Sequence, residues 1–212
     1  MTRLFLSLPL FALALLPAAA DDAPNADKGK PLFNGTDLTG WKGEGYVVED
    51  GAIVCTPQGK NLMTERTFAN YAFDFEFKLP PAGNNGLAIR YPGSGDSAYV
   101  GMTELQVLDD GDPKYADLDP RQAHGSAYGM VAARRGHLKP VGQWNEQEVT
   151  VTGSTIKVVL NGATILDADL STVTSFMADS PHPGKDRTEG HFGFAGHNDP
   201  VAFRNIRIRE LP

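Results

Sequence analysis

Three polar side chains that suit a hydroxyl-rich ligand stand in one stretch, residues 84–112. Arg90 lies in the first of two expected strands, Glu104 and Gln106 lie in the second, and a glycine-rich connection joins them. Side chains alternate along a strand, so the three would project from one side of a sheet if the apolar rows of both strands pair. A cation, a carboxylate and an amide would then share one rigid surface. An Arg–Glu cross-strand pair on a solvated face is the alternative.

A long segment without periodicity follows these strands and could add polar groups. It spans residues 114–126 and contains His124. Loops of this length in compact domains are often functional. Immediately before it, Asp109, Asp110 and Asp112 occupy a turn, where three carboxylates could ligate Ca²⁺. Their spacing matches no complete calcium loop, which favours a solvated turn, and a divalent metal ion stays an open possibility.

The elements that must position these groups are short strands and tight turns. Residues 71–79 alternate aromatic and charged side chains, which is typical of a strand with one face in a core. Asp50-Gly51 and Asn161-Gly162 are two-residue hairpin signals. The pattern predicts an all-β fold, an antiparallel two-sheet β-sandwich. The expected strands are 46–49, 52–55, 61–64, 71–79, 86–91, 102–108, 144–152, 155–160, 163–170, 190–197 and 201–209.

The first 20 residues have the layout of a secretory signal peptide. A short cationic start precedes an apolar run over residues 4–16, and an Ala-x-Ala site ends at Ala20, after which cleavage is expected. The apolar run is too short for a membrane span. The rest of the chain is predicted to be a flexible leader over residues 21–30 and a single domain over residues 31–212.

The amino-acid composition argues against one class of binding partner and against disulfide bonding within the chain. The formal net charge is −7 and no cluster of basic residues is present, which argues against nucleic acid as a ligand. Cys55 is the only cysteine, so an internal disulfide cannot form. With no basic neighbour around it, Cys55 is expected to be buried and inert.

Several motifs in fixed order resemble one family. They are LFNGTDLTGW near the start, NNGLAIRY and ELQVLDD in the middle, the QAHGSAYG turn, a W-x-x-x-x-V strand, and the closing GHFGFAGHNDPVAFRNIRI. Together they resemble the 3-keto-disaccharide hydrolase domain family over residues 31–210. The resemblance implies a jelly-roll sandwich like the concanavalin-type lectins. It also implies an exported bacterial protein, periplasmic or secreted, acting on a 3-keto-disaccharide or another glycoside.

The chemistry that the resemblance implies differs from ordinary glycoside hydrolysis. A ketone at carbon 3 acidifies the hydrogen on carbon 2, so a base can remove it and the glycosidic oxygen can leave carbon 1. Such a site needs a base, an electropositive group near the ketone oxygen and an acid for the leaving group. It does not need the two carboxylates that flank the bond in most glycosidases. A metal ion could supply the electropositive group.

The family resemblance also suggests roles for individual residues. Glu104 or His124 would be the base, and Arg90 would steady the enolate oxygen. The side chains expected to bind substrate are Gln106, Asp109, Tyr128, His197 and Asp199.

A non-catalytic, lectin-like carbohydrate-binding module is the alternative function, since such sandwiches also support binding alone. That alternative predicts a shallow groove floored by an exposed aromatic platform. Trp41 and Trp144 are the only tryptophans, and both stand where a sandwich would bury them. Their expected burial favours an enzyme.

Overall fold

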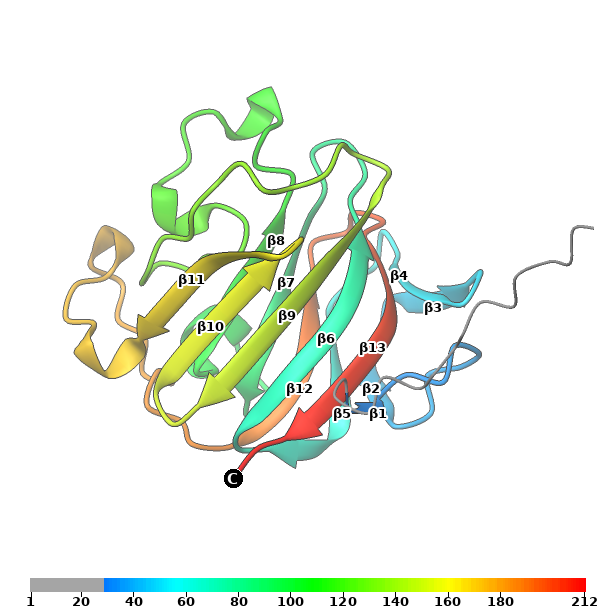
Figure 1. The fold of residues 1–212 in the computed structure, drawn as a ribbon, viewed down its shortest axis with the longest axis horizontal. Coiled ribbons are helices and arrows are strands. Elements are labelled where there is room, and N and C mark those ends of the chain that lie inside the picture. Colours follow the sequence, from blue (N-terminus) through cyan, green and yellow to red (C-terminus); the bar gives the residue numbers. More distant parts are fainter. Residues whose placement is uncertain (1–28) are drawn as a thin grey trace, which may run out of the picture.

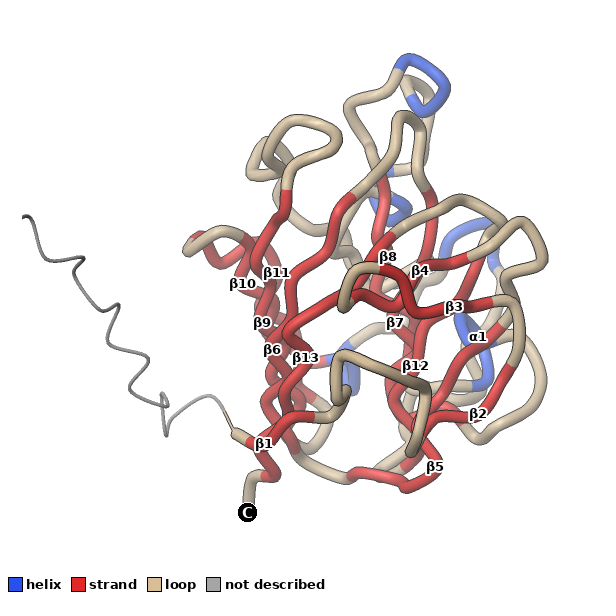
Figure 2. The backbone as a smooth tube through the Cα atoms, turned by 90° about the vertical axis from the view of Figure 1, so that its right-hand side faces the viewer, coloured by secondary structure: helices blue, strands red, loops and turns tan. Residues whose placement is uncertain are grey.

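The fold is an antiparallel β-sandwich of two sheets, as the alternation predicts. A computed structural model describes residues 29–212. The predicted signal peptide, residues 1–20, and most of the predicted leader lie outside the described residues. Figure 1 shows the larger sheet in front of the smaller one, and Figure 2 shows the two layers from the side. No helix in the described part of the chain is long and apolar enough to cross a membrane.

The larger sheet has eight strands in the order β11-β10-β9-β6-β13-β4-β3, with β1 paired to β13. All of its pairs are antiparallel. Because Lys30 lies in β1, this sheet begins one residue before the predicted domain boundary. The strands are β1 (Lys30–Pro31), β3 (Tyr46–Glu49), β4 (Ala52–Cys55), β6 (Tyr71–Lys78), β9 (Trp144–Thr152), β10 (Thr155–Leu160), β11 (Ala163–Asp169) and β13 (Ala202–Glu210).

The smaller sheet has five antiparallel strands in the order β2-β5-β12-β7-β8. One short helix, α1 (Ser97–Val100), interrupts the glycine-rich connection between β7 and β8. Sequence periodicity could not predict it, because four residues make a single turn. The strands are β2 (Trp41–Gly43), β5 (Asn61–Phe68), β7 (Asn84–Tyr91), β8 (Thr103–Leu108) and β12 (Gly190–Gly196).

The core lies between the sheets and is rich in aromatic rings. Tyr71, Phe73 and Phe77 of β6 are fully buried, which confirms the predicted alternation of that strand. Phe194 of β12 stacks on Phe203 of β13 with ring centroids 4.0 Å apart, so rings from both sheets interlock. Burying one such side chain stabilises the fold by about 1.5–3 kcal/mol. The core therefore holds both sheets rigidly enough to serve as a platform.

Two strand irregularities set the direction of important side chains. In β13 the register shifts between Arg204 and Arg207, and Asn205 between them has a φ of 53°. In the pairing of β12 with β7 the register shifts opposite Arg90, which has a φ of 48°. Such a bulge turns the following side chains away from a simple alternation.

Long connections cover the ends of the sandwich. The segment between β8 and β9 contains η1 (Pro113–Tyr115) and η2 (Pro120–Gln122), and the segment between β11 and β12 contains η3 (Leu170–Thr172) and η4 (Met177–Asp179). Asp112 and Asp119 cap η1 and η2 through their carboxylates. These one-turn helices shape the loop predicted to be functional.

Candidate active site

A cavity of ≈ 200 Å³ opens over the face of the small sheet that is turned away from the core. Glu104 and Gln106 of β8 reach into it, while Leu105 between them is fully buried in the core. This is the period-two alternation of a strand with one apolar face. Residues of α1, of the segment 115–128 and of the turn after β12 complete the lining.

A short segment hydrogen-bonds to the open side of β8 and brings Tyr128 to the cavity. Gly125 N donates to Gln106 O at 2.7 Å, and Tyr128 N donates to Glu104 O at 2.9 Å. Leu105 and Ala127 form an isolated antiparallel bridge between these bonds. The loop therefore continues the sheet for a few residues. Its backbone hydrogen bonds to β8 hold Tyr128 beside Glu104.

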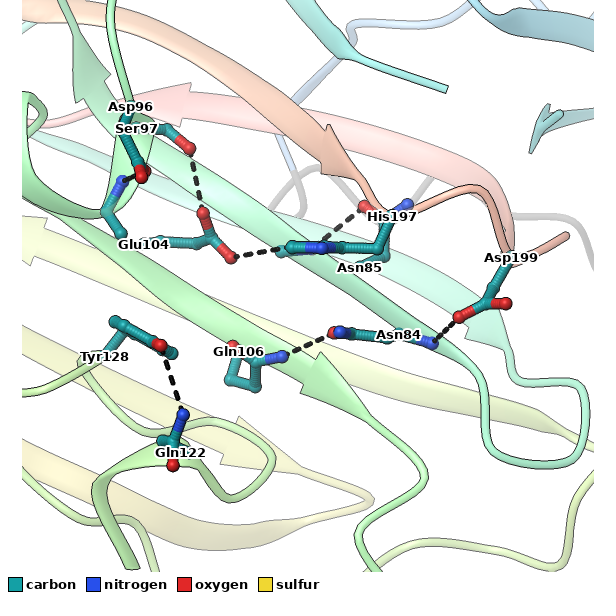
Figure 3. A network of polar contacts seen from close by, with 12 residues as sticks. Asn84, Asn85, Asp96, Ser97, Glu104, Gln106, Gln122, Tyr128, His197 and Asp199 are labelled. Carbon is teal, nitrogen blue, oxygen red and sulfur yellow. Dashed lines mark hydrogen bonds and ion pairs between the residues drawn. The ribbon is translucent and has the colours of Figure 1, made fainter. Parts of the chain in front are cut away.

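Glu104 is one of two carboxylates that line the cavity, with Asp96, and Figure 3 shows its polar contacts. Its side chain is largely buried, and its Oε2 accepts a hydrogen bond of 2.8 Å from Ser97 Oγ of α1. This bond fixes the orientation of the carboxylate and leaves Oε1 without a bond to Ser97. A carboxylate held in this way can act as a proton acceptor in the cavity.

His197 provides the positive charge beside this carboxylate. Its Nε2 lies 3.8 Å from Oε1 of Glu104, an ion pair too long for a direct hydrogen bond. The interaction with Glu104 raises the pKa of His197, and burial opposes that effect. No Arg or Lys side chain lines the cavity in the part of the chain that the structure describes. A protonated imidazole is therefore its source of cationic charge.

Gln106 presents an unsatisfied acceptor to the cavity. Its Nε2 donates to Asn84 Oδ1 at 2.6 Å, while its Oε1 has no partner among the described residues although the side chain is only 4% exposed. A buried acceptor without a partner costs about 1–3 kcal/mol, so a ligand hydroxyl that donates to it would bind favourably. The backbone N–H of Asn84 is held in turn by Asp199 Oδ2 at 3.1 Å.

Three tyrosines, Tyr99, Tyr115 and Tyr128, also line the cavity. The hydroxyl of Tyr128 accepts a hydrogen bond of 3.1 Å from Gln122 Nε2, which leaves its own proton free to be donated. The ring of Tyr99 meets that of Tyr128 edge-on with centroids 6.3 Å apart. Burial raises the pKa of Tyr99, so its hydroxyl stays protonated well beyond neutral pH.

Arg90 does not lie with Glu104 and Gln106, and the prediction that all three share one face is wrong. Its guanidinium is buried, and it donates to Ala69 O at 2.9 Å and to Gly153 O at 2.7 Å. The cause is the bulge in β7, where the left-handed backbone of Arg90 breaks the alternation. Arg90 ties turns of the two sheets together and cannot steady an oxyanion in the cavity.

His124 is also outside the cavity, contrary to its predicted role as a possible base. It is buried, its Nδ1 accepts from Leu108 N at 3.2 Å, and its Nε2 pairs with Gln147 Oε1 at 2.9 Å. The accepted bond fixes the neutral tautomer with the proton on Nε2. Burial lowers the pKa of His124 to about 4. Both nitrogens are occupied, so the ring serves the packing against Phe77.

The two remaining predicted residues support the cavity from outside it. Asp109 accepts from Ala82 N at 3.0 Å, and Asp199 holds the backbone of Asn84. Neither lines the cavity.

Asp110 accepts from His124 N and pairs with Arg135 at 3.3 Å. Within residues 29–212 no group of three or more His, Cys, Asp or Glu could hold a metal ion.

The site can now be compared with known proteins. Residues 28–209 match the sequence profile of the family described as the 3-keto-alpha-glucoside-1,2-lyase-like domain. The chain belongs to this family. The match runs from before β1 to Arg209, the penultimate residue of β13, and includes every residue of the cavity.

Relatives of this lyase-like domain agree in sequence and in fold. A protein of Bacteroides thetaiotaomicron named 3-keto-disaccharide hydrolase is 26% identical over 231 residues, which cover 88% of this chain and 80% of that protein. The crystal structure of a candidate glycosyl hydrolase from Parabacteroides distasonis superposes with a TM-score of 0.77 at 25% identity, over 86% of this chain and 98% of that one. A carbohydrate-binding module of Bacillus subtilis shares the fold, with a TM-score of 0.52 at 12% identity, over 82% of this chain and 97% of that one.

Several residues in or next to the cavity were not singled out from the sequence. Asn84 begins β7, and Ser97 and Tyr99 lie in α1, inside a connection read as a glycine-rich turn. The pair Asp96-Ser97 could have indicated a helix start, since Asp96 caps α1 through Ala98 N. Gln122 lies in η2 and begins the QAHGSAYG motif, but its contact with Tyr128 depends on the folded loop, so the motif alone did not assign it a role.

The two tryptophans bear on the choice between enzyme and binding module. Trp41 is buried as predicted, and it stacks on Phe194. Trp144 is only partly buried, so the expectation of burial is wrong for it. Its ring lies between Arg204, at 4.0 Å, and Lys78, at 4.9 Å. Neither tryptophan lines the cavity, so neither offers a sugar platform there.

Proposed function

We propose that this domain cleaves glycosides that carry a ketone at carbon 3 of the sugar ring. Glu104 removes the proton from carbon 2, the electrons form an enolate, and the glycosidic oxygen leaves carbon 1 with a proton. Water then adds at carbon 1 and a proton returns to carbon 2, which gives net hydrolysis. The observation that carries the proposal is the Glu104–His197 pair over a small, polar cavity.

Each step has a candidate residue in the cavity. The Glu104 carboxylate accepts the proton, and the His197 imidazolium stabilises the negative charge that develops on the ketone oxygen. This places on His197 the electrostatic role first predicted for Arg90. Tyr128 donates to the leaving oxygen, because its hydroxyl accepts from Gln122 and keeps its own proton available. The acceptor of Gln106 binds a sugar hydroxyl.

The names of the relatives support this chemistry over ordinary hydrolysis. The family description specifies a 1,2-lyase, and the Bacteroides thetaiotaomicron relative is named for 3-keto-disaccharides. Ordinary glycosidases use two carboxylates that act in concert. Asp96 is the other carboxylate of the cavity, and its Oδ1 already accepts from Ala98 N to cap α1.

The deciding experiment is incubation with 3-keto-trehalose or a 3-keto-glucoside while free sugar is measured. We expect release by the wild type and a loss of about 10²–10⁴-fold in Glu104→Gln, the range for a general base. In deuterated water, the released 3-keto sugar should carry deuterium at carbon 2. Binding of the substrate without turnover by the wild type would favour the carbohydrate-binding module instead.

We also propose that the domain is exported to the periplasm or the medium. The sequence features that support this are the cationic start, the apolar run and the Ala-x-Ala site that ends at Ala20. Mass spectrometry of protein from the extracytoplasmic fraction should find Asp21 as the first residue. Full-length protein recovered only from the cytoplasm would contradict the proposal.

A further inference from the structure

The two oxygens of the Glu104 carboxylate have different surroundings. Oε2 accepts the hydrogen bond from Ser97 Oγ at 2.8 Å, and Oε1 lies 3.8 Å from His197 Nε2. Both Glu104 and Ser97 are at most 4% exposed, so water competes little for these contacts. The carboxylate therefore has one oxygen held by the protein and one turned toward the charged side of the cavity (Figure 3).

A glycine in the neighbouring strand makes room for this carboxylate. Gly86 of β7 stands on the same face, opposite Gln106 in the ladder. A Cβ added to Gly86 would lie 2.2 Å from Oε1 and 2.3 Å from Cδ of Glu104. No backbone atom is among its nearest neighbours. The side chain of Glu104 therefore lies across the strand, in space that only a glycine leaves open.

We propose that Ser97 and Gly86 are positioning residues that make Oε1 of Glu104 the oxygen that takes the proton from the substrate. Ser97 holds Oε2 with its hydrogen bond, while the gap above Gly86 lets Oε1 lie within the cavity. The inference rests on the proposed function, because it assigns a role to the base of that reaction.

The arrangement differs from a serine nucleophile and its base. In such triads the serine hydroxyl contacts the histidine, which takes its proton. Here Ser97 donates directly to Glu104, and His197 stands at the other oxygen. Protonated beside the carboxylate, His197 has no lone pair to accept a proton from Ser97. The hydroxyl of Ser97 is thus a fixed donor to the carboxylate.

The first test removes the hydroxyl. In Ser97→Ala we expect kcat to fall about tenfold or more with little change in KM, because the carboxylate loses the bond that orients it. Ser97→Thr keeps the donor and should restore kcat. Ser126→Ala is the matched control, because Ser126 is a buried serine bonded to Pro120 O and Ala133 N. That control should lower the melting temperature without lowering kcat.

The second test fills the gap. In Gly86→Ala the new methyl must displace the carboxylate, and a displacement of about 1 Å costs about a hundredfold in rate. Stability should change little, because the displaced atoms end a flexible side chain. Gly111→Ala is the matched control, since the nearest atom to a Cβ there is Asp109 Oδ1 at 3.9 Å. Wild-type kinetics in folded Gly86→Ala would overturn the inference.

A spectroscopic readout separates this inference from the proposed function. The side-chain carboxyl resonance of ¹³C-labelled Glu104, assigned with Glu104→Gln, should change its chemical shift in Ser97→Ala at fixed pH, because Oε2 loses its hydrogen bond. An unchanged chemical shift would overturn the positioning role even if the wild type releases sugar. Absence of sugar release by the wild type, together with a changed chemical shift, would instead refute the proposed reaction.

Discussion

Nε2 of His197 and Oε1 of Glu104 lie 3.8 Å apart, although one residue follows β12 and the other lies in β8. The strand order places β12 beside β7 and β7 beside β8, so two ladders bring the pair together. An isolated buried charge would be costly, and each group compensates the other. The reaction that we propose depends on this pair staying ionised.

His197 should therefore set the alkaline side of the pH profile. The pKa of His197 is raised by Glu104, so its positive charge persists above the usual value of about 6.5 and disappears as the pH rises through the raised pKa. We expect kcat/KM to fall on that side. His197→Gln should lose about 10²–10³-fold and show no such decline. A variant that keeps the alkaline limb would show that another group titrates there.

Arg90 should matter for stability rather than for catalysis. Arg90→Met leaves the carbonyl oxygens of Ala69, Gly153 and Arg187 without their donor, so the free energy of unfolding should fall by about 3 kcal/mol or more. Denaturant titration measures this loss. Where the variant is folded, its kcat should match the wild type. A large drop in kcat with unchanged stability would restore the catalytic role that the sequence suggested.

His124 should make stability decrease in acid. Its pKa is about 4 in the folded chain and about 6.5 when unfolded, so between these values the unfolded chain binds more protons. The contribution of neutral His124 to the free energy of unfolding is complete above pH 6.5. It declines as the pH falls toward 4, by on the order of 3 kcal/mol.

Unfolding free energies of the wild type and of His124→Asn, measured from pH 7 to pH 4, test this expectation. The change of unfolding free energy with pH should be smaller in His124→Asn than in the wild type. It should not vanish, because burial also lowers the pKa of His182. Equal slopes would show that His124 does not titrate in this range.

Asn84 should affect substrate binding through Gln106. Asn84→Ala removes the acceptor of Gln106 Nε2 and frees the amide to rotate, so KM should rise about five- to tenfold while kcat changes less. Asp199→Asn is the control, because an amide oxygen can still accept from Asn84 N. Steady-state kinetics on a 3-keto-glucoside measure both. Equal effects of the two substitutions would contradict a specific role for the bond between Asn84 Oδ1 and Gln106 Nε2.

The alternation of apolar and polar residues predicted the β-sandwich well, because the burial of every second side chain of a strand is visible in the local sequence. Tyr71 to Lys78 form β6 as expected, and the hairpin at Asn161-Gly162 joins β10 to β11. The same reasoning placed Glu104 and Gln106 on one face correctly. It failed for Arg90, because a bulge is created by pairing with β12 and leaves no mark in the local pattern.

The loops limited prediction of the site more than the strands did. His124 follows an irregular segment, and its burial beside Gln147 of β9 depends on how the loop packs across both sheets. Ser97 acts through a single helical turn that has no periodicity to detect. Tyr128 was predicted from the QAHGSAYG motif, while Gln122, the first residue of the same motif, was not assigned a role, because the bond between them depends on the folded loop. Local patterns thus identify the sheet that carries the site but not the loops that complete it.

The segment from Gly125 to Tyr128 has a consequence for solubility. β8 is the last strand in the order of the small sheet, and an unpaired outer strand invites another chain to add to it. Bonds from Gly125 and Tyr128, with the Leu105–Ala127 bridge, occupy backbone groups that a second molecule would use. Shortening this loop should therefore promote aggregation as well as remove Tyr128, so the protein would be expected to precipitate before its loss of activity could be measured.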